Sequence, residues 1–305
     1  MAGTTDQEAF RTQLIDTGVL LDTGVRGVFG QGAALLEIAA AVDALVTRKA
    51  ADERALRVSF PPVMPRRVLE DNGYLGSCPQ LAATVFSFEG DEDAATDQAA
   101  VAAGHGDWSG HQRATDVVMV PAACHPVYPA VAALGPVPDG GQTVDAGAAW
   151  VFRREPSNDP ARMQAFHQRE VVRIGTPDDV AAWRDGWRDR AAGMLAGLGL
   201  DTAVDEANDP FFGRAGRLLA RSQRAQKLKF EITVPIASPE PTAVASFNAH
   251  GDHFATAFGL KHADGTVAHT ACLGFGLERI SLALLRAHGF DREAWPEPVR
   301  ADLWP

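Results

Sequence analysis

The segment from Trp150 to Gly175 carries arginines in a pattern that suits phosphate binding. An apolar run of the strand type ends at Phe152, Arg153 and Arg154 follow it, and a turn-rich loop over 156–160 leads back into a second apolar strand. Arginine binds phosphate well because its rigid guanidinium stays charged and donates two parallel hydrogen bonds. Two antiparallel strands with arginines beside their loop predict a fixed cationic surface. Solvated arginines on a surface hairpin would give the same pattern.

The elements around this hairpin follow from apolar spacing and from capping residues. We expect helices over 5–52, most clearly over 32–49, and over 176–198, where Thr176 is the cap. A further helix over 274–288 ends at Gly289. Short strands are predicted over 117–120, 228–234, 244–248 and 267–272, and a loop over 89–111.

Composition excludes several classes of protein. The 305 residues carry a formal net charge of −11, which argues against a protein that wraps a large RNA. No apolar run approaches the ~20 residues of a membrane span, and the first residues are polar and acidic, so we expect no membrane association and no signal peptide. The three cysteines are too few and too scattered for a disulfide framework, which predicts a cytoplasmic protein.

Two separated motifs resemble those of class II aminoacyl-tRNA synthetases. Phe152–Glu155 matches the F-R-x-E start of motif 2, and His269–Arg279 resembles motif 3, a glycine-rich strand end that leads to an arginine on a helix. More narrowly, the chain resembles the amino acid–carrier-protein ligases, which are truncated relatives of the zinc-dependent seryl-tRNA synthetases. The resemblance runs from about residue 60 to about residue 289 and rests also on the segments 60–63, 73–75, 122–129, 162–166, 246–248 and 252–254.

This resemblance implies an α+β fold, a class II synthetase-like antiparallel sheet flanked by helices. It divides the chain into a helical N-terminal segment, residues 1–55, and a catalytic domain, residues 56–305. The stretch Phe60–Pro65 corresponds in position to motif 1, which in the family builds the dimer interface, so a homodimer is expected. A proline-rich linker explains the same stretch equally well.

The resemblance also implies a zinc site formed by Cys124, Glu170 and Cys272, at what we expect to be strand ends. No CxxC or HExxH spacing occurs, and lone cysteines more often pack in a core, so spacing alone does not predict this site. Two thiolates and a carboxylate suit Zn²⁺ and leave a fourth position open. The family places the amino group of the substrate there, next to Glu170. The histidines near these motifs are expected to be structural; they are His125, His167, His250, His253 and His269.

For the nucleotide, the resemblance implies that Arg153 binds the α-phosphate and Arg279 the γ-phosphate end of ATP, and that Glu155 faces the adenine edge. Phe166 would stack on adenine, and Glu231 would hold Mg²⁺, although a solvated strand residue is the ordinary interpretation of a glutamate at this position. The remaining residues assigned to the ATP site are Arg162, Met163, Ser246 and Asn248.

The implied activity is ATP-dependent activation of glycine or alanine as an aminoacyl-adenylate, followed by transfer to the phosphopantetheine thiol of a carrier protein. A seryl-type tRNA ligase would carry the same motifs, but residues 1–55 are too few for the usual tRNA-binding domain, so no tRNA partner is expected. A non-catalytic paralogue that binds an amino acid, or a metal-free domain with buried cysteines, would also fit parts of the pattern. Candidate surfaces for carrier docking are the N-terminal helices and residues 201–226.

Overall fold

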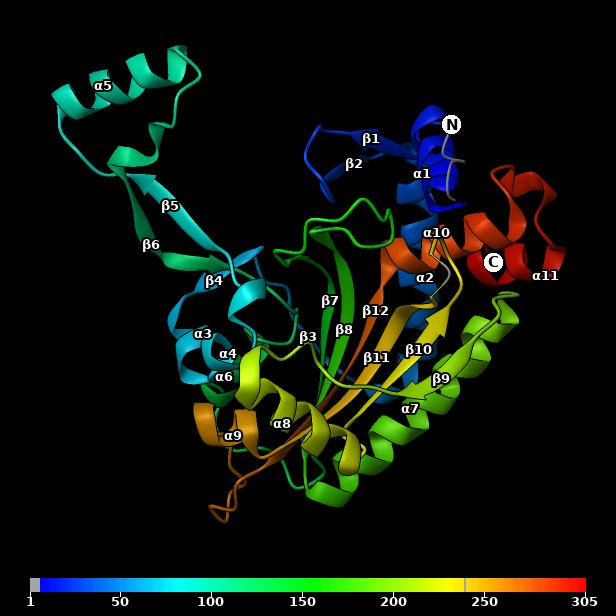
Figure 1. Ribbon diagram of the computed structural model, residues 1–305. Helices are drawn as coiled ribbons and strands as arrows, with labels where there is room; N and C mark the ends of the chain where they lie inside the picture. Colours follow the sequence, from blue (N-terminus) through cyan, green and yellow to red (C-terminus); the bar gives the residue numbers. More distant parts are fainter. Residues whose placement is uncertain (1–5, 239) are drawn as a thin grey trace.

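A computed structural model describes residues 6–238 and 240–305 and is built on one seven-stranded sheet (Figure 1). All neighbouring strands are antiparallel except β3 and β7, which run parallel. The spatial order is β3 (Leu56–Arg57), β7 (Gln142–Phe152), β8 (Ala165–Gly175), β12 (His269–Gly276), β11 (Thr242–Gly251), β10 (Lys229–Val234) and β9 (Ala203–Glu206). This sheet confirms the predicted α+β class.

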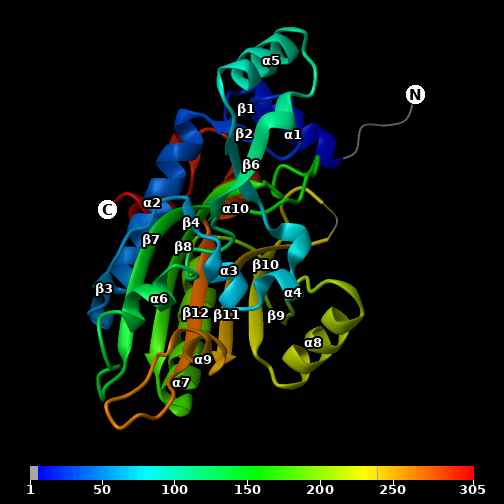
Figure 2. The same cartoon turned by 90° about the vertical axis from the view of Figure 1, so that its left-hand side faces the viewer.

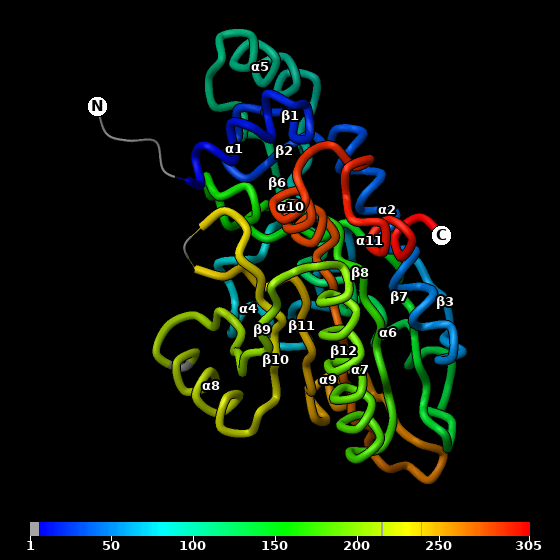
Figure 3. The backbone as a smooth tube through the Cα atoms, turned by 90° about the vertical axis from the view of Figure 1, so that its right-hand side faces the viewer, coloured from blue at the N-terminus to red at the C-terminus, as the bar shows by residue number. Residues whose placement is uncertain are grey.

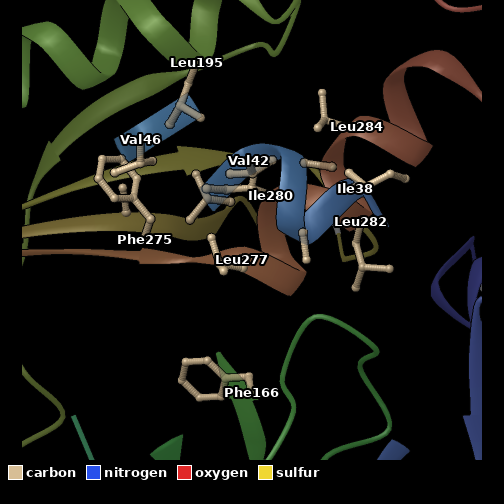
Figure 4. Packing of buried hydrophobic residues seen from close by; sticks show 14 of the residues in the cluster. Ile38, Val42, Val46, Phe166, Leu195, Phe275, Leu277, Ile280, Leu282 and Leu284 are labelled. Atoms are coloured by element: carbon tan, nitrogen blue, oxygen red, sulfur yellow. The ribbon is translucent and has the colours of Figure 1, made fainter. Parts of the chain in front are cut away.

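One set of helices covers one face of the sheet (Figure 3). They are α2 (Ala33–Lys49), α7 (Pro177–Gly197), α10 (Leu277–His288) and α11 (Glu297–Leu303), with the short turn η4 (Arg292–Ala294). Ile38 and Val42 of α2 pack beside Ile280 and Leu284 of α10 (Figure 4), because both helices present apolar residues at three- and four-residue spacing. The predicted helices over 32–49 and 176–198 are confirmed, and the Thr176 hydroxyl accepts the capping hydrogen bond.

A second set of helices lies over the opposite face (Figure 2). They are α3 (Arg67–Asp71), α4 (Tyr74–Ser77), η2 (Pro79–Leu81), α6 (Val127–Ala132), α8 (Gly213–Ala225) and α9 (His253–Phe258). The stacked rings of Tyr128 in α6 and Phe254 in α9, 4.2 Å apart, join two of these helices in a second core cluster. That cluster contains Cys124 and Cys272, so the predicted metal ligands lie on this face.

A three-stranded sheet carries an arm that projects from the body (Figure 1). The strand order of this sheet is β4 (Val63–Pro65), β6 (Gln112–Met119) and β5 (Thr84–Phe88). The helix α5 (Glu92–Ala103) and the short turn η3 (Trp108–His111) connect β5 to β6. The prediction of a loop over 89–111 is therefore wrong. The helix α5 begins at an N-cap, where the Asp91 side chain accepts a hydrogen bond from the Ala94 amide. None of its residues is buried, so its sequence lacks the periodic apolar residues from which a helix is predicted.

The predicted helix over 5–52 is two helices separated by a hairpin. Thr5 lies outside the described residues, α1 covers Asp6–Asp16, and β1 (Leu20–Asp22) pairs with β2 (Phe29–Gln31) before α2 begins. Glycines at positive φ, Gly18 at 69° and Gly24 at 78°, allow the chain to leave the helix and turn. The short turn η1 (Ala51–Glu53) then leads from α2 to β3. The division at residue 55 stays a prediction.

Candidate active site

Cross-strand pairing places predicted residues from four strands on one face of the sheet. Directly opposed residues in antiparallel strands point the same way. One row across the sheet consists of Glu231, Ser246, Gly274 and Glu170, and the next row contains Asn248 opposite Cys272. The predicted helix over 274–288 is therefore wrong over its first three residues, which continue β12.

Cys124, Glu170 and Cys272 form a compact buried cluster. One candidate ligand atom from each lies within 4.8 Å of the others, and the Cys124 amide donates a 2.8 Å hydrogen bond to Glu170 Oε2. Cys124 lies on the loop after β6, whereas Glu170 and Cys272 lie in the middle of β8 and β12. The prediction that all three occupy strand ends is wrong, because β8 and β12 continue for at least three residues on either side of Glu170 and Cys272.

The electrostatics of this cluster suit a cation. The pKa of Cys272 is raised well above that of a free thiol by its hydrogen bond with Cys124, by burial and by the nearby Glu170 carboxylate. Burial likewise raises the pKa of Glu170, and the hydrogen bonds from both cysteines and the charge of Arg153 offset this only in part. Three acidic groups therefore crowd into one buried space, where a divalent cation would favour their deprotonated forms.

Gln168 and Gly274 complete the wall of the cluster. Gln168 Oε1 accepts a 3.2 Å hydrogen bond from the Ala123 amide, so Gln168 helps Glu170 to hold the loop that carries Cys124. A Cβ at position 274 would lie only 2.6 Å from Gln168 Nε2, so the glycine is required for this close approach. Sequence reasoning missed Gln168, although it alternates with Phe166 and Glu170 and so had to share their face.

The two predicted catalytic arginines meet at one aromatic ring. The guanidinium carbons of Arg153 and Arg279 lie 5.6 Å and 5.8 Å from the centroid of the Phe166 ring. Arg279 is also held by the carbonyl oxygens of Ala161 and Ala243, at 2.8 Å and 2.9 Å. Motif 2 and motif 3, far apart in sequence, therefore build one cationic corner.

Electrostatic coupling links more of the predicted ATP residues. Burial and the charges of Arg153 and Arg162 lower the pKa of Arg279 to about 10, and Glu155 and Glu231 act in the opposite direction. Arg279 therefore stays charged at pH 7. Arg153, Arg162, Glu155 and Glu231 therefore all lie within electrostatic reach of Arg279.

The remaining ATP-site predictions differ in their surroundings. Met163 is buried and borders the same hollow as Phe166 and Arg279, whereas the Arg162 side chain is 59% exposed and lies 3.7 Å from Asp159. Asn248 Nδ2 lies 3.5 Å from Ser246 Oγ and 3.5 Å from Cys272 Sγ. Asn248 therefore lies between the predicted nucleotide residues and the cysteines.

Glu278 is a further residue that the motif comparison missed. Its buried carboxylate accepts hydrogen bonds from the His167 amide at 2.8 Å, from His167 Nδ1 at 2.7 Å and from Gln31 Nε2 at 2.7 Å. Because His167 follows Phe166 and Glu278 precedes Arg279, these bonds fix the ring and the guanidinium relative to each other. The only signal in the sequence that could have identified Glu278 was its position directly before Arg279.

The glutamate that is predicted to bind magnesium, Glu231, forms an ion pair with a buried lysine. Lys229 Nζ lies 3.0 Å from Glu231 and 2.6 Å from Asp209, so Glu231 is ion-paired in this structure. Burial raises the pKa of Asp209, but the Lys229 charge, the hydrogen bonds from Lys229 and Gln223 and the Arg153 charge together outweigh burial and lower that pKa to about 2. Gln223 of α8 exchanges two hydrogen bonds with Asp209, at 2.7 Å and 2.8 Å.

The predicted structural histidines differ in position. His125 is buried against the Asn72 amide at 2.8 Å, and burial lowers its pKa to about 3, which suits a neutral packing residue. His253 contacts the carbonyl oxygen of Asn72 at 2.9 Å. His250 instead lies beside the metal cluster, with Nε2 3.6 Å from Cys272 Sγ.

Two curated relatives decide the family. The chain is 46% identical over 279 residues to amino acid–acyl-carrier-protein ligase 1 of Bradyrhizobium diazoefficiens, covering 91% of this chain and 85% of the relative. Ligase 2 of the same organism is 43% identical, with coverages of 92% and 83%. The chain belongs to the amino acid–carrier-protein ligases. The resemblance inferred from motifs 2 and 3 is thereby confirmed for this ligase, which is an enzyme of that family.

More distant relatives of this ligase are tRNA ligases. The type-2 serine–tRNA ligase of Methanopyrus kandleri is 30% identical over 163 residues, which cover 50% of this chain and 31% of that protein. A crystal structure of A. aeolicus tRNASec in complex with M. kandleri SerRS superposes with a TM-score of 0.80 at 22% identity, covering 96% of this chain and 60% of that chain. Pyrococcus horikoshii seryl-tRNA synthetase gives 0.65 at 14% identity, covering 91% of this chain and 58% of that chain. These structures share the class II fold.

No family model matches the ligase chain. Within residues 6–238 and 240–305, none of its helices combines the length and the apolar composition that a membrane crossing requires.

Proposed function

We propose that this ligase activates glycine or alanine with ATP and transfers the aminoacyl group to the phosphopantetheine thiol of a carrier protein. One observation carries the proposal: the Cys124–Glu170–Cys272 cluster and the cationic corner of Arg153 and Arg279 are both built on strand β8. Glu170 belongs to the cluster, and Phe166, four residues earlier on the same face of the strand, contacts both guanidinium groups. A substrate amine and an ATP phosphate can therefore be bound side by side. The names of the relatives support the carrier protein as acceptor.

The cluster fits Zn²⁺. Two sulfurs and one carboxylate oxygen within 4.8 Å can each reach a single ion at the usual ~2.0–2.3 Å, and one position stays open. Zinc bound there would supply positive charge that favours the free amine of the amino acid. Glu170 would then border the amino group, and the side-chain amide of Asn248, which already approaches Cys272, would border the open position.

The chain's own groups then perform the adenylation. The substrate carboxylate attacks the α-phosphorus of ATP, the bond to the β-phosphate breaks, and pyrophosphate leaves with Mg²⁺. Arg153 and Arg279 would neutralise the charge that grows on the phosphate oxygens, and Phe166 would support adenine with Glu155 at its edge. Around them would lie the remaining ATP contacts, Arg162, Met163, Ser246 and Asn248. Glu231 would hold the Mg²⁺ that accompanies ATP, and the ion would neutralise part of the phosphate charge.

The second step forms the thioester. The phosphopantetheine sulfur attacks the acyl carbon of the aminoacyl-adenylate, the acyl–phosphate bond breaks, and AMP carries away the electron pair. The thiol proton goes to solvent or to a phosphate oxygen of the leaving AMP. This step requires no dedicated protein base.

The deciding measurement is ATP–pyrophosphate exchange by zinc-loaded protein with glycine, alanine, serine and larger amino acids. Exchange with glycine or alanine, followed by a mass increase of a phosphopantetheinylated carrier, is expected. Absence of exchange with every amino acid would point to a non-catalytic paralogue. Transfer of serine to total tRNA would replace the proposal with a seryl-type tRNA ligase.

We also propose that α8 docks the carrier protein. Its four arginines, Arg214, Arg217, Arg221 and Arg224, recur at three- and four-residue spacing, are exposed, and enter no ion pair with any residue the structure describes. Leu218 beside them is 64% exposed. A helix that is basic and partly apolar complements an acidic partner surface with a small apolar centre.

Reversing the charge on α8 should impair transfer to the carrier protein but not activation of the amino acid. We expect the Arg217→Glu/Arg221→Glu variant to raise the KM for the carrier by about tenfold or more, since each lost charge pair slows association. ATP–pyrophosphate exchange should stay unchanged. The matched control is Arg67→Glu/Arg113→Glu, which reverses two exposed arginines elsewhere on the surface. Equal effects of both double variants on the carrier KM would contradict docking at α8.

The homodimer implied by motif 1 has a candidate surface. An apolar groove of about 340 Å³ lies beside the edge strand β3 and is lined by residues 56–60, by α6 and by the turn that follows α6: Leu56, Val58, Ser59, Phe60, Val127, Ala130, Val131 and Leu134. We propose that a second copy of this chain covers it, since Leu134 is 72% exposed at its rim. Leu134→Glu should convert a dimer to a monomer in light scattering, whereas Leu75→Glu, at another exposed leucine, should not.

A further inference from the structure

Two side-chain nitrogen atoms from β11 lie close to the sulfur of Cys272. Asn248 Nδ2 lies 3.5 Å and His250 Nε2 lies 3.6 Å from the sulfur. Cys272 therefore has hydrogen-bond partners outside the candidate ligand set.

His250 is held in one orientation. Its Nδ1 lies 3.0 Å from the hydroxyl of Thr270, which is fully buried, and 3.5 Å from the Tyr128 hydroxyl. Its ring packs edge-on against Phe254, with centroids 4.8 Å apart. The ladder between β11 and β12 has a bulge between Ala249 and Gly251, which sets His250 off the regular pairing.

These contacts are compatible with a proton on Nε2. In that tautomer the Thr270 hydroxyl donates to Nδ1, and Nε2–H faces Cys272 Sγ. The opposite tautomer would turn the lone pair of Nε2 toward the sulfur of Cys272, which is repulsive once that sulfur is a thiolate. Nε2–H therefore points at Cys272 Sγ.

Charge balance gives this hydrogen bond a role. Two thiolates and a carboxylate carry three negative charges, so a divalent ion leaves one uncompensated negative charge in a fully buried cluster. Such a charge is costly unless hydrogen-bond donors surround it. A donor that spreads the charge on sulfur also weakens electron donation to the metal, which leaves the metal more able to bind a neutral amine.

We propose that His250 is a positioning residue of the metal centre: with Asn248, its Nε2–H hydrogen-bonds the Cys272 thiolate, raises metal affinity and keeps the bound metal electron-poor. This inference rests on the proposed zinc site and adds to it a residue outside the ligand set.

Zinc affinity, measured by competition with a chromophoric chelator, tests the proposal without catalysis. His250→Ala should weaken zinc binding by about 10- to 100-fold. Glutamine can place its amide N–H near the position of Nε2, whereas asparagine reaches only the position of Nδ1. His250→Gln should therefore restore most of the affinity and His250→Asn should not. A purely structural role would weaken all three alike, and wild-type affinity in His250→Ala would overturn the proposal.

Cobalt-loaded protein gives a second readout. Loss of a hydrogen bond to the thiolate should move the sulfur-to-cobalt charge-transfer band of His250→Ala to longer wavelength, and His250→Gln should move it back. If His250→Ala does not fold, Thr270→Val frees the ring at Nδ1 and should shift the band in the same direction. An unchanged band would contradict the proposal. A wild-type protein that binds neither metal would overturn the zinc site itself, which distinguishes the two failures.

Discussion

ATP–pyrophosphate exchange by the Arg279→Ala variant should fall by about 100- to 1,000-fold, with little change in thermal stability. Removing one preorganised electrostatic contact to a transition-state charge costs ~3–4 kcal/mol. Arg279 is preorganised in this sense, because two backbone carbonyl oxygens and the Phe166 ring fix its guanidinium before any ligand arrives. Its charge persists at neutral pH, since burial lowers its pKa only to about 10.

Two comparison variants sharpen this test. Arg286→Ala removes an arginine from the same helix, where it pairs with Asp6 at the surface, and should leave exchange unchanged. Arg279→Lys keeps a positive charge but loses the planar fork, so its rate should lie between those of wild type and alanine. A loss of less than about threefold in Arg279→Ala, under 1 kcal/mol, would contradict a role at the phosphates.

The Cys272→Ser variant should lose bound zinc and amino-acid activation together while it remains folded. Serine nearly preserves the size of the side chain, but its hydroxyl is a far weaker zinc ligand than a thiolate. The matched control is Cys78→Ser, which alters another buried cysteine, outside the cluster. Metal analysis, exchange rate and thermal unfolding of both variants form the measurement. Retained zinc with full activity in Cys272→Ser would place the metal elsewhere.

Residues whose chemistry is distinctive were the ones that the sequence could reveal. Arg153 and Arg279 were found from motifs, and the structure brings both to Phe166 as those motifs implied. The helices over 32–49 and 176–198 were found because each has a buried apolar stripe and a clear start or end. In these cases local spacing and tertiary packing agree.

The sequence failed where an element is stabilised by something other than an apolar stripe. The helix α5 has an Asp91 cap and many alanines but buries nothing, and the hairpin β1–β2 depends on glycines rather than on alternation. Partners fixed only by the tertiary fold were equally invisible. Gln168 against Gly274 and Lys229 against Asp209 are such pairs, because no spacing within one strand specifies what the neighbouring strand or loop supplies.

The chain of contacts from Gln223 to Glu231 means that α8 is not mechanically independent of the sheet. Gln223 makes two hydrogen bonds to Asp209, and Asp209 shares Lys229 with Glu231. If a partner displaces α8, Asp209 loses both bonds, its hold on Lys229 loosens, and the lysine shifts its charge toward Glu231. Displacement of the outer helix α8 would therefore change the charge balance at Glu231. The path consists of four side chains, which are Gln223, Asp209, Lys229 and Glu231.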